Sequence, residues 1–119
     1  MYYLALCLLE DVAIIYSLSL NRFFRSWDKN MITTCVILNY NDYQTTINLV
    51  NKIKDFPVFD YIVVVDNFST DNSYYYLKKY GNNKIIVIRT EKNGGYGYGN
   101  NYGVNYSYRV LNADYILIA

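Results

Sequence analysis

Four short runs of apolar, mostly β-branched residues recur along this chain, and stretches with helical spacing separate them. The runs are ITTCVIL at 32–38, YIVVV at 61–65, IIVI within 84–89 and YILIA at 115–119. Continuous apolar runs of this length are typical of strands that are buried on both faces of a parallel sheet. Because strands that alternate with helices are joined by right-handed crossovers, the sequence predicts an α/β domain with the order βαβαβαβ.

The segments between these runs carry the residues that start and end helices. Asp42 is a candidate cap for the first helix, and Asp71 or Ser73 for the second. Gly81 is a natural stop for the second helix, and Pro57 ends the unit that contains the first. The apolar residues at helical spacing are Ile47, Val50 and Ile53 in the first helix, and Tyr102, Tyr106 and Val110 in the third.

Composition limits both the size of the domain and its chemistry. The chain has 119 residues, 53% of them apolar, which suits one small domain with a real core. Its net charge of +1 argues against a nucleic-acid partner. It has no histidine, so histidine acid–base catalysis and histidine metal ligation are excluded. Cys7 and Cys35 form no Cys-x-x-Cys motif, and a reducing, cytoplasmic location fits this cysteine content.

Residues 1–30 form a separate N-terminal extension before the domain at 31–119. Residues 1–20 are long enough to span a bilayer, but Glu10 and Asp11 at their centre argue against insertion. The extension is expected to be helical, and to pack on the domain or to have no fixed role. Met31 is also a candidate start of the ancestral domain. A basic-aromatic patch follows residue 20 and makes this extension a candidate for peripheral contact with the inner face of a membrane: Arg22, Phe23, Phe24, Arg25, Trp27 and Lys29.

Polar residues follow three of the predicted strands at the point where each strand ends. Ligands of open parallel sheets bind beyond the carboxyl ends of the strands, so these residues are expected to converge on one edge. The residues are Asn39 and Tyr40 after the first strand, Asp66, Asn67 and Ser69 after the second, and Asn93 with the following glycines after the third. The Asp66 carboxylate can accept a hydrogen bond from a nucleobase or ribose, or it can simply hold a turn. For Asp71 we favour helix capping.

The stretch 92–103, KNGGYGYGNNYG, holds five of the six glycines and is expected to be a loop that opens a helix. Glycine lets the backbone approach a ligand closely, and a helix N-terminus favours anions such as phosphate. The stretch is neither a Walker loop nor a dinucleotide fingerprint, because both the spacing and the position in the strand order differ. A flexible connection remains the alternative.

The runs VILNYN, VVVDNFSTDNS and NGGYGYGNNYG, in this order, resemble the three sequential motifs of family 2 glycosyltransferases, especially the rhamnosyltransferase-like branch. The resemblance covers 31–119 and implies the nucleotide-binding half of a GT-A, Rossmann-like fold. It places Leu38, Asn39 and Tyr40 against the nucleobase, and Asp66 against the base or ribose. It also implies that Asn93, Gly94 and Gly95 line the nucleotide pocket, with Asn100 and Asn101 close by.

The same resemblance implies transfer of a sugar, with inversion, from a nucleotide-diphosphate sugar to a glycan or lipid-linked acceptor. In the family an Asp-x-Asp motif follows the fourth strand and holds Mg²⁺ or Mn²⁺. This chain ends at YILIA, before that point, so the metal ligands and the catalytic base are expected to lie outside it. The chain alone is therefore expected to be inactive, and its last strand to leave an open apolar edge that favours self-association.

A different class of function stays open, namely a non-catalytic nucleotide-binding module or an inactive remnant that needs a partner chain. A dehydrogenase-like domain would need Gly-x-Gly-x-x-Gly after the first strand, where LNYND stands instead. A sugar nucleotidyltransferase would need a glycine-rich basic loop there. A phospho-receiver domain would need an acidic cluster, of which only Asp66 is present.

Overall fold

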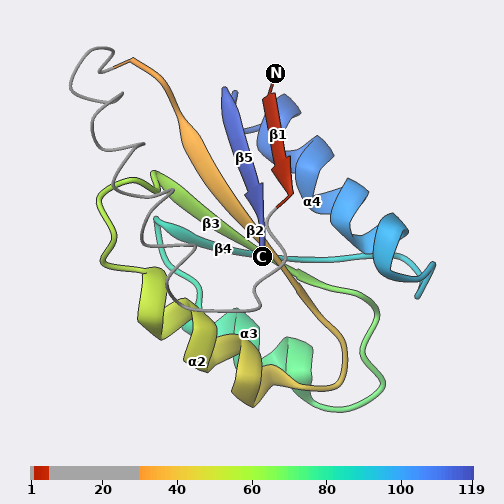
Figure 1. Cartoon of the computed structure of the whole chain (residues 1–119). Coiled ribbons are helices and arrows are strands. Elements are labelled where there is room, and N and C mark those ends of the chain that lie inside the picture. The colour runs from red at the N-terminus through yellow and green to blue at the C-terminus, as the bar shows by residue number, and fades with distance from the viewer. Residues whose placement is uncertain (1, 6–29) are drawn as a thin grey trace.

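The computed structural model describes residues 2–5 and 30–119, and they form a parallel sheet with helices on both faces (Figure 1). Within these residues the sheet has five strands in the order β1-β5-β2-β3-β4. The predicted alternation of strands and helices is confirmed for 33–118. The strands are β1 Tyr2–Ala5, β2 Thr33–Asn39, β3 Tyr61–Asp66, β4 Ile85–Arg89 and β5 Tyr115–Ile118. The helices are α2 Tyr43–Ile53, α3 Ser73–Tyr80 and α4 Tyr96–Arg109.

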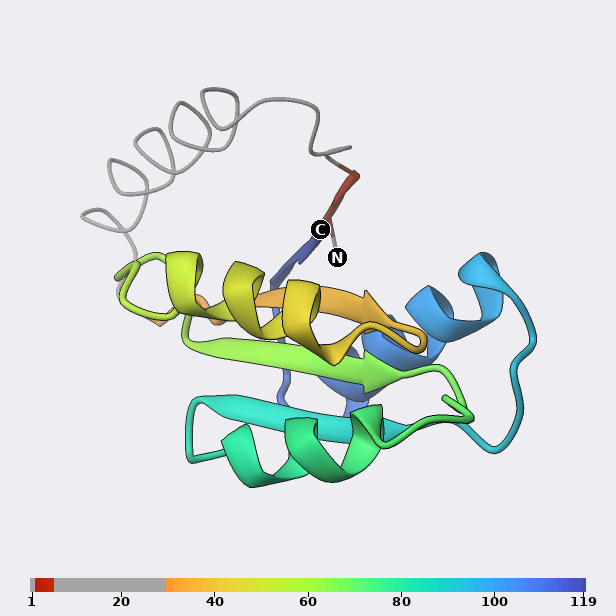
Figure 2. The same ribbon diagram turned by 90° about the horizontal axis from the view of Figure 1, so that it is seen from below.

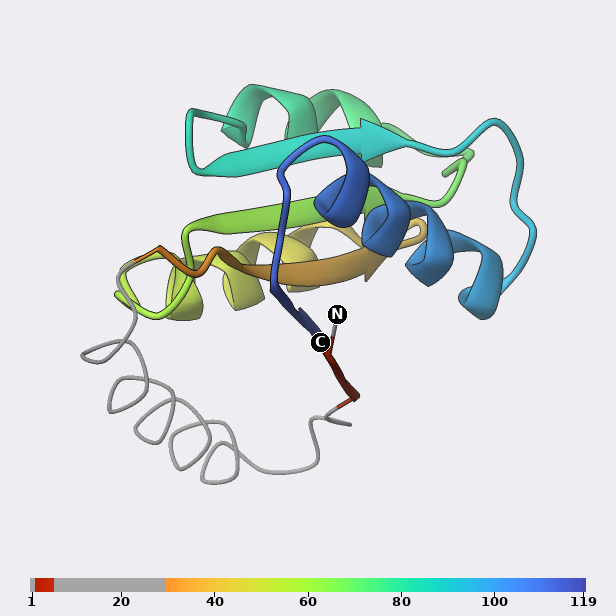
Figure 3. The same ribbon diagram turned by 90° about the horizontal axis from the view of Figure 1, so that it is seen from above.

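The helices divide between the two faces of the sheet, as the crossover rule requires. Helices α2 and α3 lie side by side on one face, and of the described helices α4 covers the other (Figures 1 and 2). Helix α4 contacts β2, β3 and β5 (Figure 3). Each helix runs antiparallel to the strands, so all three helices begin at the carboxyl edge of the sheet and end at its amino edge (Figure 2).

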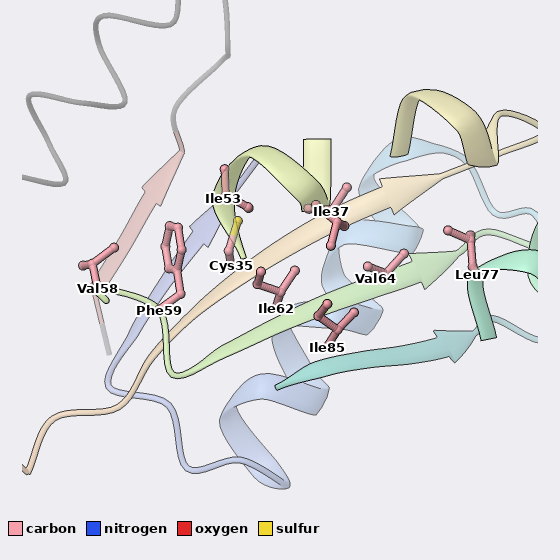
Figure 4. Packing of buried hydrophobic residues seen from close by; sticks show 10 residues of the cluster. Cys35, Ile37, Ile53, Val58, Phe59, Ile62, Val64, Leu77 and Ile85 are labelled. Atoms are coloured by element: carbon pink, nitrogen blue, oxygen red, sulfur yellow. The ribbon is translucent and has the colours of Figure 1, made fainter. Parts of the chain in front are cut away.

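Two apolar clusters fill the spaces between the helices and the sheet. On the α2 and α3 face, Cys35, Ile62 and Val64 from the strands pack against Ile53 and Leu77 from the helices (Figure 4). On the α4 face, alternate residues of the same strands pack against the helix. That second cluster contains Val36, Val63, Val65, Val104, Ala113 and Ile116. Both faces of β2 and β3 are thus buried, which explains their continuous apolar sequence.

The glycine-rich stretch proves to be more helix than loop. Helix α4 begins at Tyr96, so only residues 92–95 of the stretch precede it, and the expected loop 92–103 is wrong for residues 96–103. A Cβ at Gly99 would stand 2.4 Å from Leu38 Cδ1, and one at Gly103 would stand 2.5 Å from Val36 Cγ1. These two glycines therefore let α4 pack directly on the sheet.

The expected helix ends are largely confirmed. Asp42 caps α2, because its Oδ1 accepts a hydrogen bond of 3.2 Å from the Thr45 amide. The N-cap of α3 is Asn72 and not the expected Asp71 or Ser73, although Asp71 Oδ1 accepts a hydrogen bond of 2.8 Å from the Ser73 amide at the start of this helix. Gly81 ends α3 in an extended conformation. Val110, one of the apolar residues at helical spacing in the third helix, is exposed at the C-terminal cap of α4.

The N-terminal extension contributes a strand where a helix was expected. Residues Tyr2–Ala5 form β1, which pairs in parallel with β5, so the prediction of a helix is wrong for these four residues. For residues 1 and 6–29 the prediction falls outside the described residues. Because β1 lies on one side of β5 and β2 on the other, β5 is not the open edge that was expected.

Candidate nucleotide-binding rim

The loops that follow β2, β3 and β4 meet at the carboxyl edge of the sheet, which Figure 2 shows at the arrowheads. We call the residues 38–42, 66–72 and 89–95 at this edge the rim. The last residues of the three strands are in register, so that Asn39, Asp66 and Arg89 form a row across the sheet. Strand register alone thus places an amide, a carboxylate and a guanidinium next to one another.

Asp66 is the centre of this row and is fully buried. Its Oδ1 accepts hydrogen bonds from Asn39 Nδ2, at 2.9 Å, and from the Ser69 hydroxyl. Its Oδ2 accepts one of 3.2 Å from the Ser69 amide and lies 3.3 Å from Arg89 Nε. Both carboxylate oxygens are therefore bound by protein donors, which offset the cost of burying the charge.

Asn39 and Asn41 link the first loop to the second. Asn39 Oδ1 accepts a hydrogen bond of 2.8 Å from the Thr46 hydroxyl on α2, which fixes the orientation of its amide toward Asp66. Asn41 Oδ1 accepts one of 2.8 Å from the Thr70 amide, and the Asn41 amide donates one of 2.9 Å to Ser69 Oγ. These bonds make the first two loops a single connected unit.

Arg89 closes the row from the third strand. Besides its ion pair with Asp66, its Nη2 donates a hydrogen bond of 2.9 Å to the Ser69 carbonyl. Its guanidinium lies over the rings of Phe68, at 4.8 Å, and Tyr74, at 5.2 Å. Phe68 has a left-handed backbone, with φ of 61°, and its ring is 43% exposed. Arg89 therefore supports both the carboxylate and a strained loop residue.

The third loop joins the rim through Asn67. Its Nδ2 donates hydrogen bonds of 3.1 Å to Asn93 Oδ1 and 3.2 Å to the Gly95 carbonyl. The Thr90 hydroxyl donates to the Lys92 carbonyl at 2.9 Å. Gly95, with φ of 88°, is the N-cap of α4. All three loops are thus held in one arrangement before any ligand is considered.

A protein-family comparison matches residues 34–118 of this chain to the model described as glycosyl transferase family 2. The match covers more than half of the chain and contains β2 except its first residue, β3 to β5 and the whole rim. The chain belongs to glycosyl transferase family 2. No curated protein and no solved structure gives a significant match. Its parallel sheet with alternating helices is consistent with the N-terminal half of the GT-A fold.

The residues that the glycosyltransferase resemblance singled out occupy different positions in the rim. Leu38 packs beneath Gly99, and Tyr40 is 47% exposed. Asn100 is buried on α4, with no hydrogen-bond partner for its Oδ1 among the described residues. Asn101, the next residue of the helix, is exposed. The predicted residues that the structure brings together by hydrogen bonds are Asn39, Asp66 and Ser69 in one group, and Asn67, Asn93 and Gly95 in another.

Asp66 was expected to contact the nucleotide, but its carboxylate is buried and is bonded to protein groups. A ligand could reach its oxygens only by displacing Asn39, Ser69 or Arg89, so direct contact stays a prediction. The sequence reasoning missed Arg89, Asn41 and Phe68, which support or form the rim. Arg89 ends its strand just as Asn39 and Asp66 end theirs, and this shared position was a usable signal.

Family 2 glycosyltransferases typically depend on a divalent metal, and the rim does not provide a site for one. In residues 2–5 and 30–119 no group of three His, Cys, Asp or Glu residues is placed to hold a metal ion. The buried carboxylate of Asp66 already neutralises Arg89. These residues therefore do not fit Mg²⁺ or Mn²⁺.

Proposed function

We propose that the rim binds the nucleotide of a nucleotide-diphosphate sugar, and that this chain supplies donor binding to a family 2 glycosyltransferase. The reaction would be transfer of the sugar, with inversion, to a glycan or lipid-linked acceptor. The observation that carries the proposal is the row of Asn39, Asp66 and Arg89, which locks three loops into one preformed edge. Ligand sites in parallel α/β sheets lie at such an edge.

Two exposed aromatic rings on the rim offer surfaces for a nucleobase. Tyr40 is 47% exposed and Phe68 is 43% exposed, and they come from loops that Asn41 ties together. A base can stack on either ring, since every base has a π-face. Behind Phe68 the Arg89 guanidinium fixes the loop, so the ring is already positioned. In this proposal Asp66 orients the loops, and backbone groups beside Tyr40 and Asn67 meet the base and ribose.

The rhamnosyltransferase-like branch remains our proposal for the donor class. It is supported by the runs VILNYN, VVVDNFSTDNS and NGGYGYGNNYG, whose residues form β2, β3, α4 and the rim between them. Calorimetric titration with UDP, dTDP and GDP, each with and without Mn²⁺, would identify the preferred base. We expect metal-independent binding, because the rim residues do not form a metal site.

The sharpest test replaces Tyr40 with alanine and compares it with Tyr108→Ala. Tyr108 is 52% exposed near the C-terminal end of α4, at the amino edge of the sheet, whereas Tyr40 lies at the carboxyl edge. The two variants therefore remove similar rings from opposite edges of the sheet. Loss of one stacking contact costs about 1–3 kcal/mol, so Tyr40→Ala should weaken nucleotide binding roughly 5- to 150-fold. Tyr108→Ala should bind nucleotide like the parent. Equal affinities of all three folded proteins would contradict the stacking proposal.

A binding-only module is the second candidate function, and the missing metal cluster in the described residues favours it for these residues alone. The two candidates differ in turnover. Hydrolysis or transfer of the preferred sugar nucleotide by the chain with Mn²⁺ would support the enzyme. Because the chain alone is expected to be inactive, nucleotide binding without turnover would support donor binding by the rim under both candidates.

A further inference from the structure

Charged residues of the domain are divided between the two edges of the sheet. The amino edge is where β2, β3, β4 and β5 begin and where all three helices end, opposite the rim (Figures 2 and 3). Six basic residues against three acidic ones leave this edge with a charge of +3. The basic residues are Lys52, Lys54, Lys78, Lys79, Lys84 and Arg109, and the acidic ones are Asp55, Asp60 and Asp114.

The carboxyl edge has the opposite sign. There two basic residues stand against four acidic ones, which leaves −2. The basic residues are Arg89 and Lys92, and the acidic ones are Asp42, Asp66, Asp71 and Glu91. Although the net charge of the whole chain is small, the amino edge of the domain is positive and the carboxyl edge is negative.

Two of the three acidic residues of the amino edge accept hydrogen bonds from backbone amides. Asp60 Oδ2 accepts a hydrogen bond of 2.8 Å from the Thr33 amide, and Asp114 Oδ2 accepts one of 2.8 Å from the Ile32 amide. Among the basic residues of this edge, Lys52, Lys78, Lys79 and Arg109 are exposed. The potential that a partner meets at this edge is therefore positive.

Helix dipoles explain only part of this arrangement. A cation in the last turn stabilises a helix, and Lys52, Lys79 and Arg109 each meet that description. The dipole does not explain two exposed apolar side chains at the same edge. Tyr108 is 52% exposed and Val110 is 57% exposed, on either side of Arg109. Exposed tyrosine and aliphatic groups among basic residues are typical of protein surfaces that contact lipid bilayers.

We propose that the amino edge is a docking surface for a bilayer that contains anionic lipids. The exposed lysines on α2 and α3 would face the headgroups, while Tyr108 and Val110 at the end of α4 enter the interface. The positive charge of this edge favours an anionic partner. The exposed Tyr108 and Val110 favour a bilayer over a purely polar polyanion. The described residues contain no helix long and apolar enough to cross a membrane.

This docking surface would set the orientation of the domain. The rim lies at the opposite end of every strand, so it would face away from the bilayer and toward dissolved nucleotides (Figure 2). The negative rim would also be the end of the domain that anionic headgroups repel. The inference concerns an edge that the proposed nucleotide site does not use, so either can fail without the other.

The test is co-sedimentation of the full chain with vesicles of phosphatidylcholine, with and without phosphatidylserine. Each basic residue at an anionic surface contributes about a fivefold gain in partitioning, so Lys78→Gln/Lys79→Gln should lower partitioning roughly 30-fold. Tyr108→Ala should lower it several-fold. The matched controls are Lys92→Gln and Tyr40→Ala, which change the rim and should partition like the parent. Circular dichroism checks that each variant folds.

Three results would overturn the proposal. Equal partitioning into vesicles with and without phosphatidylserine would remove the charge argument. Parent-like partitioning of the Lys78→Gln/Lys79→Gln protein would place the contact elsewhere in the chain, for example in the sequence that carries Arg22, Arg25 and Lys29. Displacement of the protein from vesicles by a duplex DNA oligonucleotide would indicate a general polyanion surface instead.

Discussion

Asp66 and Arg89 form the ion pair on which the rim depends. Breaking a buried pair typically costs about 3–5 kcal/mol, because it leaves an uncompensated charge. The Asp66 side chain is 0% exposed but that of Arg89 is 36% exposed, so solvent would screen part of the loss. We expect Arg89→Met to lower the free energy of unfolding by about 2–3 kcal/mol, measured by urea denaturation.

A double-mutant cycle separates this pair from general packing. Asp66→Asn removes the charge while keeping an oxygen that can accept from Asn39 and Ser69. Once the carboxylate is neutral, Arg89→Met should cost clearly less than it does in the parent. Additive effects of the two substitutions would show that Arg89 acts through its hydrogen bond to the Ser69 carbonyl and its contacts with Phe68 and Tyr74, and not through the ion pair.

Cys35 is the free thiol of the described residues, and it is buried within β2. Burial disfavours the thiolate and raises the pKa of Cys35 to about 12. We expect Cys35 to resist iodoacetamide at pH 8 in the folded protein and to react after unfolding, as followed by peptide mass spectrometry. Because the folded pKa is raised, its contribution to stability is complete below the unfolded pKa of about 8.5 and falls as pH rises toward 12. Rapid native alkylation would contradict this environment.

Among the described helices, α4 depends most on glycine, because residues without a side chain let it pack closely on the sheet. Alanine is usually the better helix former by about 1 kcal/mol, but a Cβ at Gly103 would stand 2.5 Å from Val36 Cγ1 and 2.7 Å from Val65 Cγ2. Gly103→Ala should therefore destabilise the protein, by about 1–3 kcal/mol. Gly97 lies in the same helix, and its Cβ would have no neighbour within 4 Å. Gly97→Ala should stabilise by about 0.5–1 kcal/mol, so thermal melts of the two variants should shift in opposite directions.

The sequence predicted the strands and helices of the domain well because their apolar periods are strong. Residues 33–37 and 62–65 are buried on both faces of the sheet, and the runs that contain them are therefore continuously apolar. The start of α4 was missed because glycine carries no periodic signal, although Gly99 and Gly103 face the sheet. Strand β1 was missed because its partner β5 lies more than a hundred residues away in sequence. Pairing at such a distance leaves no local pattern.

For the rim, the sequence predicted the location better than the roles. Strand ends could be placed from the apolar runs, so Asn39, Asp66 and Asn67 were correctly expected on one edge. Whether a carboxylate faces solvent or neighbouring donors depends on side-chain packing, which one sequence does not encode locally. The burial of Asp66 behind Asn39 and Arg89 depends on such packing, so it could not be predicted from the sequence.

At the scale of the whole molecule, an unpaired edge strand of the sheet is the place where we expect two copies of the chain to associate. In the sheet formed by the described residues β5 is flanked on both sides, and the two edge strands are β1 and β4. Ile86 is in register with Val63 on the α4 face and is only half-buried. We expect concentration-dependent dimers in sedimentation equilibrium, and we expect Ile86→Lys to shift them toward monomers. A parent protein that is monomeric at every concentration would contradict this prediction.

The hydrogen-bond ladder of the sheet continues past the ends of its strands. The Asn67 amide donates to the Asn39 carbonyl at 2.8 Å, and the Thr90 amide donates to the Asp66 carbonyl at 3.0 Å. These rim amides should exchange with deuterated solvent almost as slowly as those of the central strands. A nucleotide would then meet a surface that is already ordered, so association should follow one fast phase without a preceding conformational step.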